Sequence, residues 1–339
     1  MATTIKDIAR VANVSNPAVS AVLNNKTNCR VSPATRERIL HAAREMNYKP
    51  NFSGLLLRGE KTKTVALLIS QIWHKSEEFM KDMIISLMRQ FDDQGYACYF
   101  ADIAGDADSN CTKVQEFISR GVHHFVFLGS PHGREQIKEL IESRNKSYIV
   151  YGSSSFLNRY VESDTVSGVA SIIRFFLSRG KSNFRMLINA VDKGNMLANP
   201  WICGLIAAFP DVDLETLLKR HVTEFDAAKY YKLDSFVKSG YEETMMIIKE
   251  YPHIQAIFYL SDFYAIGGAK LLLEKGFNIG RDILLAGFNE SSAARNYPYP
   301  ISSVEYDIDK ITQAITEESL KENRPFNVLV PTIVHIREL

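Results

Sequence analysis

The sequence has no apolar run long enough to cross a bilayer. Its longest runs, such as 65–69 and 202–209, fall far short of the roughly 20 residues that a membrane-spanning helix needs. The first ten residues begin an amphipathic pattern and lack the apolar centre of a secretory signal. We therefore expect a cytoplasmic protein that is neither exported nor embedded in a membrane.

Cysteine is also scarce and widely spaced. The chain has four, with no Cys-x-x-Cys pair: Cys29, Cys98, Cys111 and Cys203. This spacing argues against a disulfide framework and against a cysteine zinc site, and it fits a reducing compartment.

Catalytic signatures are missing as well. There is no Gly-x-Ser-x-Gly elbow, no Walker A loop and no His-Glu-x-x-His helix. His123, His124 and His132 bracket a predicted strand without carboxylate or cysteine companions, which favours a strand edge over a metal site. We expect a protein that is not an enzyme and that has no metal and no cofactor.

The charge of the chain is unevenly distributed. Residues 1–63 hold 11 Lys and Arg against 4 Asp and Glu, a net +7, whereas the other 276 residues hold 29 against 35, a net −6. A basic head on a mildly acidic body is expected where the head alone meets a polyanion such as DNA, although a solvated basic surface gives the same count.

The first fifty residues predict three short helices. Thr4, with Asp7 three residues later, begins a first helix over residues 5–12, and Ser15 caps a second one that tolerates Pro17 in its first turn. Ser32 begins a third, which ends near residue 47. Two such helices joined by about three or four residues have the spacing of a helix-turn-helix, whose second helix enters the major groove. The apolar positions of the second helix point inward, which leaves a face of four outward residues: Asn16, Pro17, Ser20 and Ala21.

This head resembles the lactose/galactose repressor family of bacterial transcription regulators. The matching stretches are 4–9, 14–15, 19–20, 22–24, 31–32, 35–39 and 47–51. The resemblance implies base contacts from Asn16, Pro17 and Ala21 in the first turns of the second helix, which also contains Ala18. It implies phosphate contacts from six further residues: Thr4, Ser15, Ser20, Asn24, Tyr48 and Asn51.

The chain departs from the family pattern where sequence is read. The usual arginine at position 21 is Ala21, and Pro17 offers no side-chain hydrogen bond, so bidentate guanine recognition from this helix is lost. We expect a half-site with adenine opposite Asn16 and thymine methyls near Pro17 and Ala21. The alternative is a degenerate reader of weak specificity.

Residues 50–62 are expected to form a hinge. The apolar stretch within them is too short for a stable free helix, and Gly54, where the family usually has alanine, weakens it further. In the family this segment folds on the operator and drives a leucine into the minor groove, and Leu57 stands at that position. The alternative is that the leucines pack as ordinary core.

From residue 63 onward, short apolar runs alternate with longer helical patterns, which predicts a doubly wound α/β body with parallel sheets. Strands are expected at 65–70, 97–101, 124–128, 148–151, 184–189, 256–260 and 283–287, and helices at 78–94, 112–120, 135–144, 165–179, 200–208, 241–251, 263–275 and 308–322. The body resembles periplasmic sugar-binding proteins, which have two lobes around a ligand cleft. That resemblance implies one lobe of 63–178 with 302–326 and another of 179–301 with 327–339.

The ligand cleft implied by the resemblance has lost most of its polar anchors. The carboxylate of Asp164 is kept, but the arginine expected before Gly204 is Trp201, the asparagine before Asp262 is Ser261, and the aspartate after Phe288 is Asn289. Aromatic residues could line the cleft instead, namely Trp73, Phe79, Trp201, Phe236 and Tyr264.

Three interpretations of the cleft stay open: a carbohydrate-related ligand bound by ring stacking, a partner protein or other ligand, and a cleft that Trp201 fills. The head and body together predict a homodimeric regulator, most simply a repressor, with a near-palindromic DNA operator and a small-molecule effector as partners. A solute-binding protein without a DNA function is the competing class.

Overall fold

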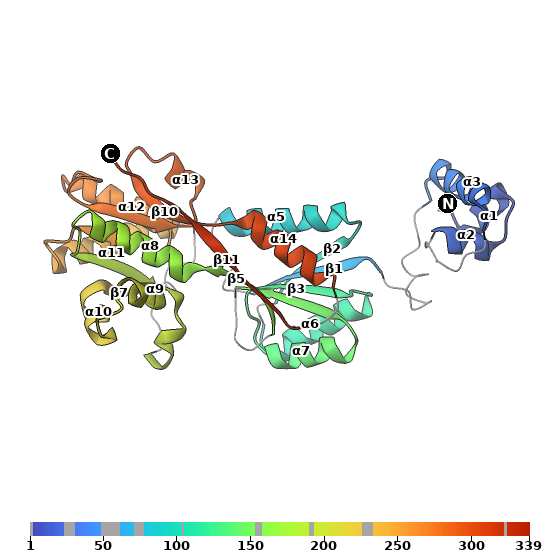
Figure 1. The fold of residues 1–339 in the computed structure, drawn as a ribbon, viewed down its shortest axis with the longest axis horizontal. Helices are drawn as coiled ribbons and strands as arrows, with labels where there is room; N and C mark the ends of the chain where they lie inside the picture. The colour runs from blue at the N-terminus through green and yellow to red at the C-terminus, as the bar shows by residue number, and fades with distance from the viewer. Residues whose placement is uncertain are drawn as a thin grey trace. The chain divides into compact units, whose positions relative to one another are not determined.

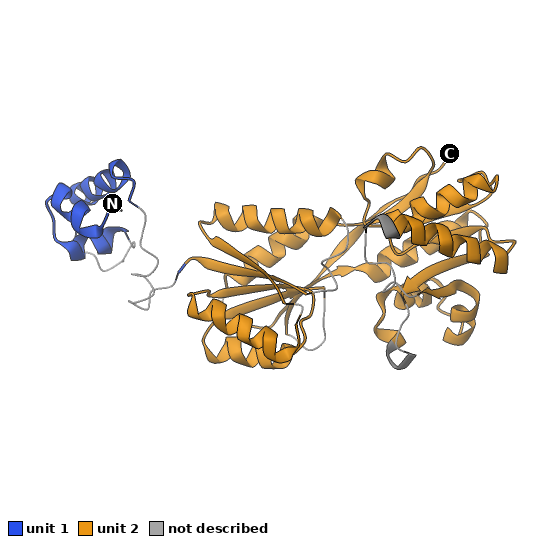
Figure 2. Ribbon diagram, turned by 180° about the vertical axis from the view of Figure 1, so that it is seen from behind, with its two compact units in different colours: residues 1–62 blue, residues 63–339 orange. Residues whose placement is uncertain are grey.

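The computed structural model describes residues 3–23, 31–48, 62–70, 78–103, 105–152, 158–189, 193–225, 233–321 and 324–339. The chain divides into two compact units, residues 1–62 and 63–339, which Figure 2 colours separately. Among the described helices, none has both the length and the apolar character needed to cross a membrane.

The first unit is a bundle of short helices. Its helices are α1 (Ile5–Ala12), α2 (Asn16–Leu23) and α3 (Pro33–Glu45). Each begins where the sequence predicts, because the Thr4 and Ser32 hydroxyls accept hydrogen bonds from backbone amides three residues on and the Ser15 hydroxyl does so from Ala18. The expected stripes meet in one core, in which Ile8, Val19 and Ile39 are completely buried.

Lobe 1 of the second unit is a parallel sheet between two layers of helices (Figure 1). Its strands lie in the order β2-β1-β3-β4-β5, followed by the first half of β11. They are β1 (Thr64–Ile69), β2 (Ala97–Asp102), β3 (His124–Leu128), β4 (Ser147–Tyr151), β5 (Arg159–Asp164) and β11 (Phe326–His335). One face is covered by α5 (Glu78–Asp93) and α14 (Ile308–Ser319), and the other by α6 (Ala107–Ser119) and α7 (Arg134–Ser143).

Lobe 2 repeats this plan. Its sheet has the order β11-β10-β9-β8-β6-β7 and is parallel except for the antiparallel pair of β10 with β11. The strands are β6 (Phe184–Asn189), β7 (Val222–Phe225), β8 (Ala256–Phe258), β9 (Leu284–Phe288) and β10 (Ile301–Tyr306). One face is covered by α8 (Thr165–Ser178), α9 (Pro200–Ala208) and α10 (Leu214–His221), and the other by α11 (Leu233–Glu250) and α12 (Asp262–Glu274). A 3-10 helix, η2 (Lys193–Ala198), and the short α13 (Ser292–Arg295) complete the lobe.

The chain crosses between the lobes at Asp164, after Tyr306 and near Pro331. The crossings expected near 179, 302 and 327 were therefore misplaced. Helix α8 packs in the core of lobe 2, so Gly180 marks only a helix end. Strand β10 pairs with β9 as far as Val304, and β11 leaves β5 only at Pro331.

Four strands were not predicted: β5, β7, β10 and β11. The physical reason is clearest in β10, where two serines interrupt the apolar run and yet are buried. The Ser303 hydroxyl donates to Asp262 Oδ1 at 2.7 Å, and the Ser302 hydroxyl accepts from the Arg337 amide at 3.1 Å. Hydrogen bonds to residues far away in the sequence allow these polar side chains to be buried. The helix expected at 241–251 begins earlier, at Leu233, and α10 and α13 were also not predicted.

Candidate nucleic-acid interface and interlobe pocket

The exposed face of α2 is short and uncharged. Val19 and Val22 are buried in the head core, which leaves Asn16 and Pro17 exposed to solvent. Three more residues of the expected interface are half-buried on the same helix: Ala18, Ser20 and Ala21. The first turns of α2 therefore present one side-chain amide and one hydroxyl, those of Asn16 and Ser20, together with a proline ring and two alanine methyl groups.

Local hydrogen bonds fix the ends of the helices that carry this face. The Thr4 amide and hydroxyl both donate to Asp7 Oδ2, at 3.0 and 2.6 Å, and the Asp7 amide donates back to the Thr4 hydroxyl at 3.4 Å. These hydrogen bonds from Thr4, helped by the charge of Arg10, lower the pKa of the Asp7 carboxyl. The Thr4 side chain is thus oriented by its own helix.

The other expected DNA contacts are only partly placed. Tyr48 follows α3 and packs against the edge of the head core, half-buried. The remaining four, Asn24, Asn51, Gly54 and Leu57, lie outside the described residues. Trp73, expected in the ligand cleft, also lies outside them.

In the second unit, the structure brings Phe79 and Asn289 together. Both line one small pocket where the first turn of α5, from lobe 1, meets the loop between β9 and α13, from lobe 2. Asn289 has a left-handed backbone (φ 90°), and its backbone N–H donates to the Val304 carbonyl at 2.7 Å. The pocket has a cavity volume of about 40 Å³, which is room for a few water molecules rather than for a sugar ring.

A row of aromatic rings runs from this pocket into lobe 2. The ring of Phe79 lies 5.0 Å from that of Tyr306, which lies 5.1 Å from Phe288, which in turn lies 5.1 Å from Trp201. Trp201 also contacts Phe258 at 4.8 Å and is half-buried. Trp201 therefore packs on the lobe 2 core.

Ser261 and Asp262 lie at the start of α12, behind the pocket. Asp262 is completely buried; its Oδ1 accepts from the Ser303 hydroxyl and its Oδ2 from the Ser291 amide, the latter at 2.5 Å. Burial, reinforced by the charge of Glu290, raises the pKa of Asp262 to about 7 despite these hydrogen bonds. A Cβ on Gly287 would stand 2.3 Å from Asp262 Oδ1, so only glycine fits beside this carboxyl. Asp262 therefore supports the Asn289 loop from inside.

The other expected cleft residues lie apart from Asn289. Asp164 caps α8 at the first crossing between the lobes, where its Oδ1 accepts from the Ser167 amide at 2.9 Å. Phe236 and Tyr264 are buried in the α11–α12 core with their rings 5.3 Å apart. For these two aromatic residues, the expectation of a cleft lining gives way to core packing.

The family comparisons agree with this arrangement. Residues 4–51 match the model of the bacterial regulatory proteins of the lacI family, and residues 173–338 match a periplasmic binding protein-like domain. Residues 4–51 therefore form a lacI-family DNA-binding head, and the chain joins this head to a periplasmic binding protein-like domain, the plan of a DNA-binding transcription regulator.

The similarity to several relatives and solved structures covers nearly the whole chain. Catabolite control protein A of Staphylococcus xylosus is 26% identical and covers 99% of both chains. The HTH-type transcriptional regulator RegA of Clostridium saccharobutylicum is 25% identical over 92% of this chain and 90% of its own. The structure of the lac repressor dimer bound to operator and the anti-inducer ONPF has a TM-score of 0.74 at 18% identity, covering 100% and 99% of the two chains. The CelR–cellobiose complex has a TM-score of 0.64 at 21% identity and covers 99% of both.

Three buried serine hydroxyls of the body lie at strand ends, and two of them, those of Ser70 and Ser130, were not predicted. The Oγ atoms of Ser70, Ser130 and Ser261 are buried and have no hydrogen-bond partner among the described residues. Each serine lies just beyond the carboxyl end of a parallel strand, β1, β3 or β8, the edge where α/β folds place their ligands. The sequence signal, a serine ending an apolar run, was too common to single out Ser70 and Ser130.

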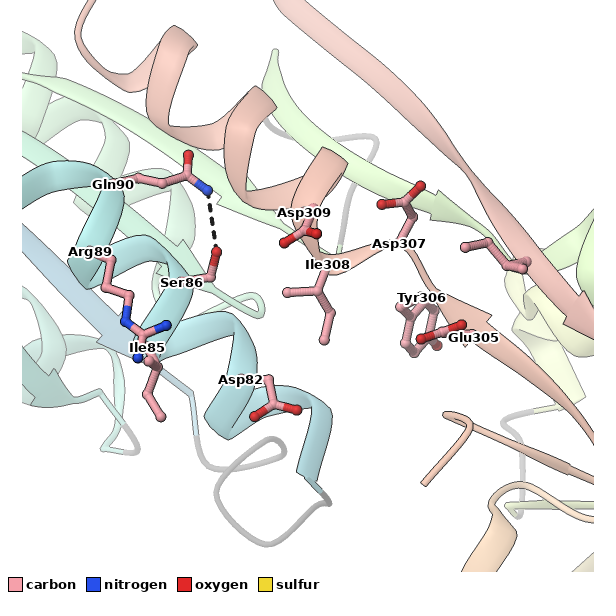
Figure 3. A pocket seen from close by; sticks show the side chains of 11 residues that line it. Asp82, Ile85, Ser86, Arg89, Gln90, Glu305, Tyr306, Asp307, Ile308 and Asp309 are labelled. Carbon is pink, nitrogen blue, oxygen red and sulfur yellow. Dashed lines mark hydrogen bonds between the residues drawn. The ribbon is translucent and has the colours of Figure 1, made fainter. Parts of the chain in front are cut away.

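A second, larger hollow lies on the outer side of the junction. It has a volume of about 540 Å³ and runs between α5 and the crossing segment 305–309 (Figure 3). Two of the acids that line it have close partners: Glu305 contacts His335 at 2.6 Å, and Asp307 pairs with Lys310 at 2.7 Å.

Proposed function

We propose that this lacI-family regulator is a homodimeric repressor that binds a near-palindromic operator through residues 1–49, with 50–62 as a hinge. The observation that carries the proposal is the α2 face. It is uncharged, with Asn16 and Pro17 exposed, and it belongs to an N-terminal region, residues 1–63, of net charge +7. The basic surface supplies phosphate affinity, and Asn16 supplies the only amide on that face for reading bases. The operator-bound lac repressor dimer, with the same overall fold, supports the dimer.

The test is operator selection with the full chain, followed by a salt titration of the selected site. We expect adenine opposite Asn16 and a steep loss of affinity between 50 and 200 mM salt, as several phosphate contacts require. Asn16→Ala should lose the adenine preference and keep the salt slope. A selected site with an obligatory guanine opposite Ala21 would contradict the proposed readout.

We further propose that a neutral, carbohydrate-related molecule binds between the lobes and controls operator affinity. The support is chemical: Trp201 is a partly exposed aromatic residue at the end of a row of rings that starts at the interlobe pocket, and Asn289 is a neutral polar group in that pocket. The buried hydroxyls of Ser70, Ser130 and Ser261 have no partner among the described residues and would bond to such a ligand, since a buried hydroxyl without a partner is costly. A solved relative by fold, CelR, is a cellobiose complex.

A thermal-shift screen with neutral sugars, sugar phosphates and uronic acids tests this, because a ligand of the folded state raises the melting temperature. A hit among neutral sugars that Asn289→Ala abolishes supports the proposal. A panel without any hit favours the second candidate, regulation by a partner protein, which the tight packing of Trp201 on Phe258 and Phe288 also favours.

A further inference from the structure

One side chain of lobe 1 reaches across to lobe 2. Glu78 is the first residue of α5, and its carboxylate accepts two hydrogen bonds from Ser292, the first residue of α13. The Ser292 amide donates to Oε2 at 2.8 Å, and the Ser292 hydroxyl donates to Oε1 at 2.7 Å. The two residues are 214 positions apart in the chain, so this contact exists only while the lobes are held together.

The electrostatics of this contact favour the ionised carboxylate. The two hydrogen bonds from Ser292, with the nearby charges of Arg295 and Lys81, lower the pKa of Glu78. Glu78 is therefore charged at neutral pH, and both bonds are charge-assisted, which makes each stronger than a bond between neutral groups.

The loop that carries Ser292 is held rigidly within lobe 2. Glu290 is buried and has φ 50°, and the Arg337 guanidinium donates hydrogen bonds to both of its carboxylate oxygens. The Ser291 amide is bonded to the buried Asp262. Because the loop cannot follow α5, separation of the lobes must break the Glu78–Ser292 contact rather than stretch the loop.

The contact also closes the interlobe pocket. Glu78, Phe79, Asn289 and Ser291 line the same cavity, and the Phe79 ring packs on Tyr306 beside it. The cavity of about 40 Å³ has room for only a few water molecules, so a larger ligand beside Asn289 requires this pocket to widen.

We propose that Glu78 is a positioning residue that latches lobe 1 to lobe 2 through Ser292, and so sets the balance between joined and separated lobes that ligand entry requires. The inference rests on the proposed ligand response of the interlobe pocket and deepens it. Removing the latch should raise the ratio of separated to joined lobes by about ten-fold, the effect expected from losing one or two hydrogen bonds of this kind.

The experiment measures the distance between the lobes in the full chain without added ligand. Spin labels are placed at two exposed positions, Glu139 on α7 and Lys249 on α11, in a background whose four cysteines are replaced by serine. Double electron–electron resonance then gives the distance distribution for each variant.

Four variants separate the latch from a general effect of charge. Glu78→Ala should shift weight to longer distances, and Ser292→Ala should do so less, because the backbone amide remains. Glu78→Gln should restore much of the original distribution, since its amide oxygen can accept from the backbone and its NH2 can donate to the hydroxyl. Asp82→Ala, which removes an exposed carboxylate from the same helix and pocket, should leave the distribution unchanged.

An unchanged distribution in both Glu78→Ala and Ser292→Ala, with normal thermal unfolding, would overturn the latch. Equal shifts in Glu78→Ala and Asp82→Ala would also overturn it, as a charge effect. Operator affinity, measured in parallel by fluorescence anisotropy, separates the two proposals. A distance shift with unaltered operator affinity supports the latch and contradicts the control of DNA binding by the lobes.

Discussion

The DNA-binding face and the interlobe pocket are built in opposite ways. In the head, the contacts that orient Thr4 and Ser15 come from amides three residues away, so a short stretch of sequence fixes each side chain. In the pocket, Glu78 and Ser292 are 214 residues apart, and Asp262 and Ser303 are 41 apart. The face that reads DNA is thus determined locally, whereas the pocket exists only once both lobes have folded and met.

The largest expected effect is on the free energy of unfolding, and it concerns hydrogen bonds between residues far apart in the sequence. Arg159, which is completely buried at the start of β5, donates to the carbonyls of Tyr148 (2.9 Å), Glu318 (2.7 Å) and Arg324 (2.6 Å). Arg159→Ala should lower the free energy of unfolding of the body by about 3 to 5 kcal/mol, because three carbonyls lose their donor and two of these hydrogen bonds are buried. Urea unfolding followed by circular dichroism measures this.

The matched control for that variant is Arg174→Ala, which removes an exposed arginine that bonds one carbonyl, that of Ala207. It should cost less than about 1 kcal/mol. Similar losses in the two variants would show that burial of Arg159 does not matter as argued.

The second effect is a pH dependence that arises from the buried carboxyl behind the pocket. Burial raises the pKa of Asp262 from 3.8 to about 7, so between these values the folded protein binds more protons than the unfolded chain. Its contribution to stability is therefore greatest at low pH and falls as pH rises, by up to about 1.4 kcal/mol per pH unit.

Asp262→Asn should remove this slope and keep both hydrogen bonds, because the amide oxygen can accept from the Ser291 amide and the NH2 can donate to the Ser303 hydroxyl. Unfolding free energies of the two proteins at pH 4.5, 6 and 7.5 should converge at low pH and diverge in favour of the variant as pH rises. Parallel curves would contradict a raised pKa.

The same contrast explains what the sequence could predict. The head helices and their caps were predicted closely because Ser32 and Thr4 act within one helical turn. In the body, strand β9 was placed within one residue, since its apolar run is continuous. Strand β10 was missed because Ser302 and Ser303 look like loop residues until Asp262 and Arg337 are near them.

The pocket was predictable only in part, for the same reason. Asn289 and Phe79 could be proposed from the family pattern and from residue type, and the structure places them together. Phe236 and Tyr264 could not be distinguished from cleft residues, because an aromatic side chain in the core of lobe 2 has the same sequence signal. Glu78 was visible only as a helix start, and Ser292 had no signal of its own.

A third prediction sharpens the comparison at the DNA face. Ala21→Arg should restore a bidentate donor on the half-buried outer side of α2 and create a preference for guanine at one operator position, worth about 1 to 3 kcal/mol of discrimination. Operator selection measures this, and Ala21→Lys, which has the charge but not the two-pronged donor, is the control. The locally determined face should accept the change without loss of thermal stability, and a destabilised head would argue against a free position.

The smallest expected effect is the most local one. Thr4→Ala removes the hydroxyl of the capping box and should destabilise the start of α1 by about 1 kcal/mol, seen as faster amide hydrogen exchange in residues 5–8, while the exchange of body strands is unaltered. Thr4→Ser keeps the hydroxyl and should behave as the original.

In the unmodified protein, the pKa of Asp7 is lowered by the same Thr4 bonds, so the stability they add is present at neutral pH and is lost as pH falls through that lowered pKa. Protection of the first turn should therefore fade in acid for the Thr and Ser forms and depend less on pH in Thr4→Ala. If all three forms share one pH profile, the cap is not what fixes this helix, and the local account of the DNA-binding face would have to rest on core packing alone.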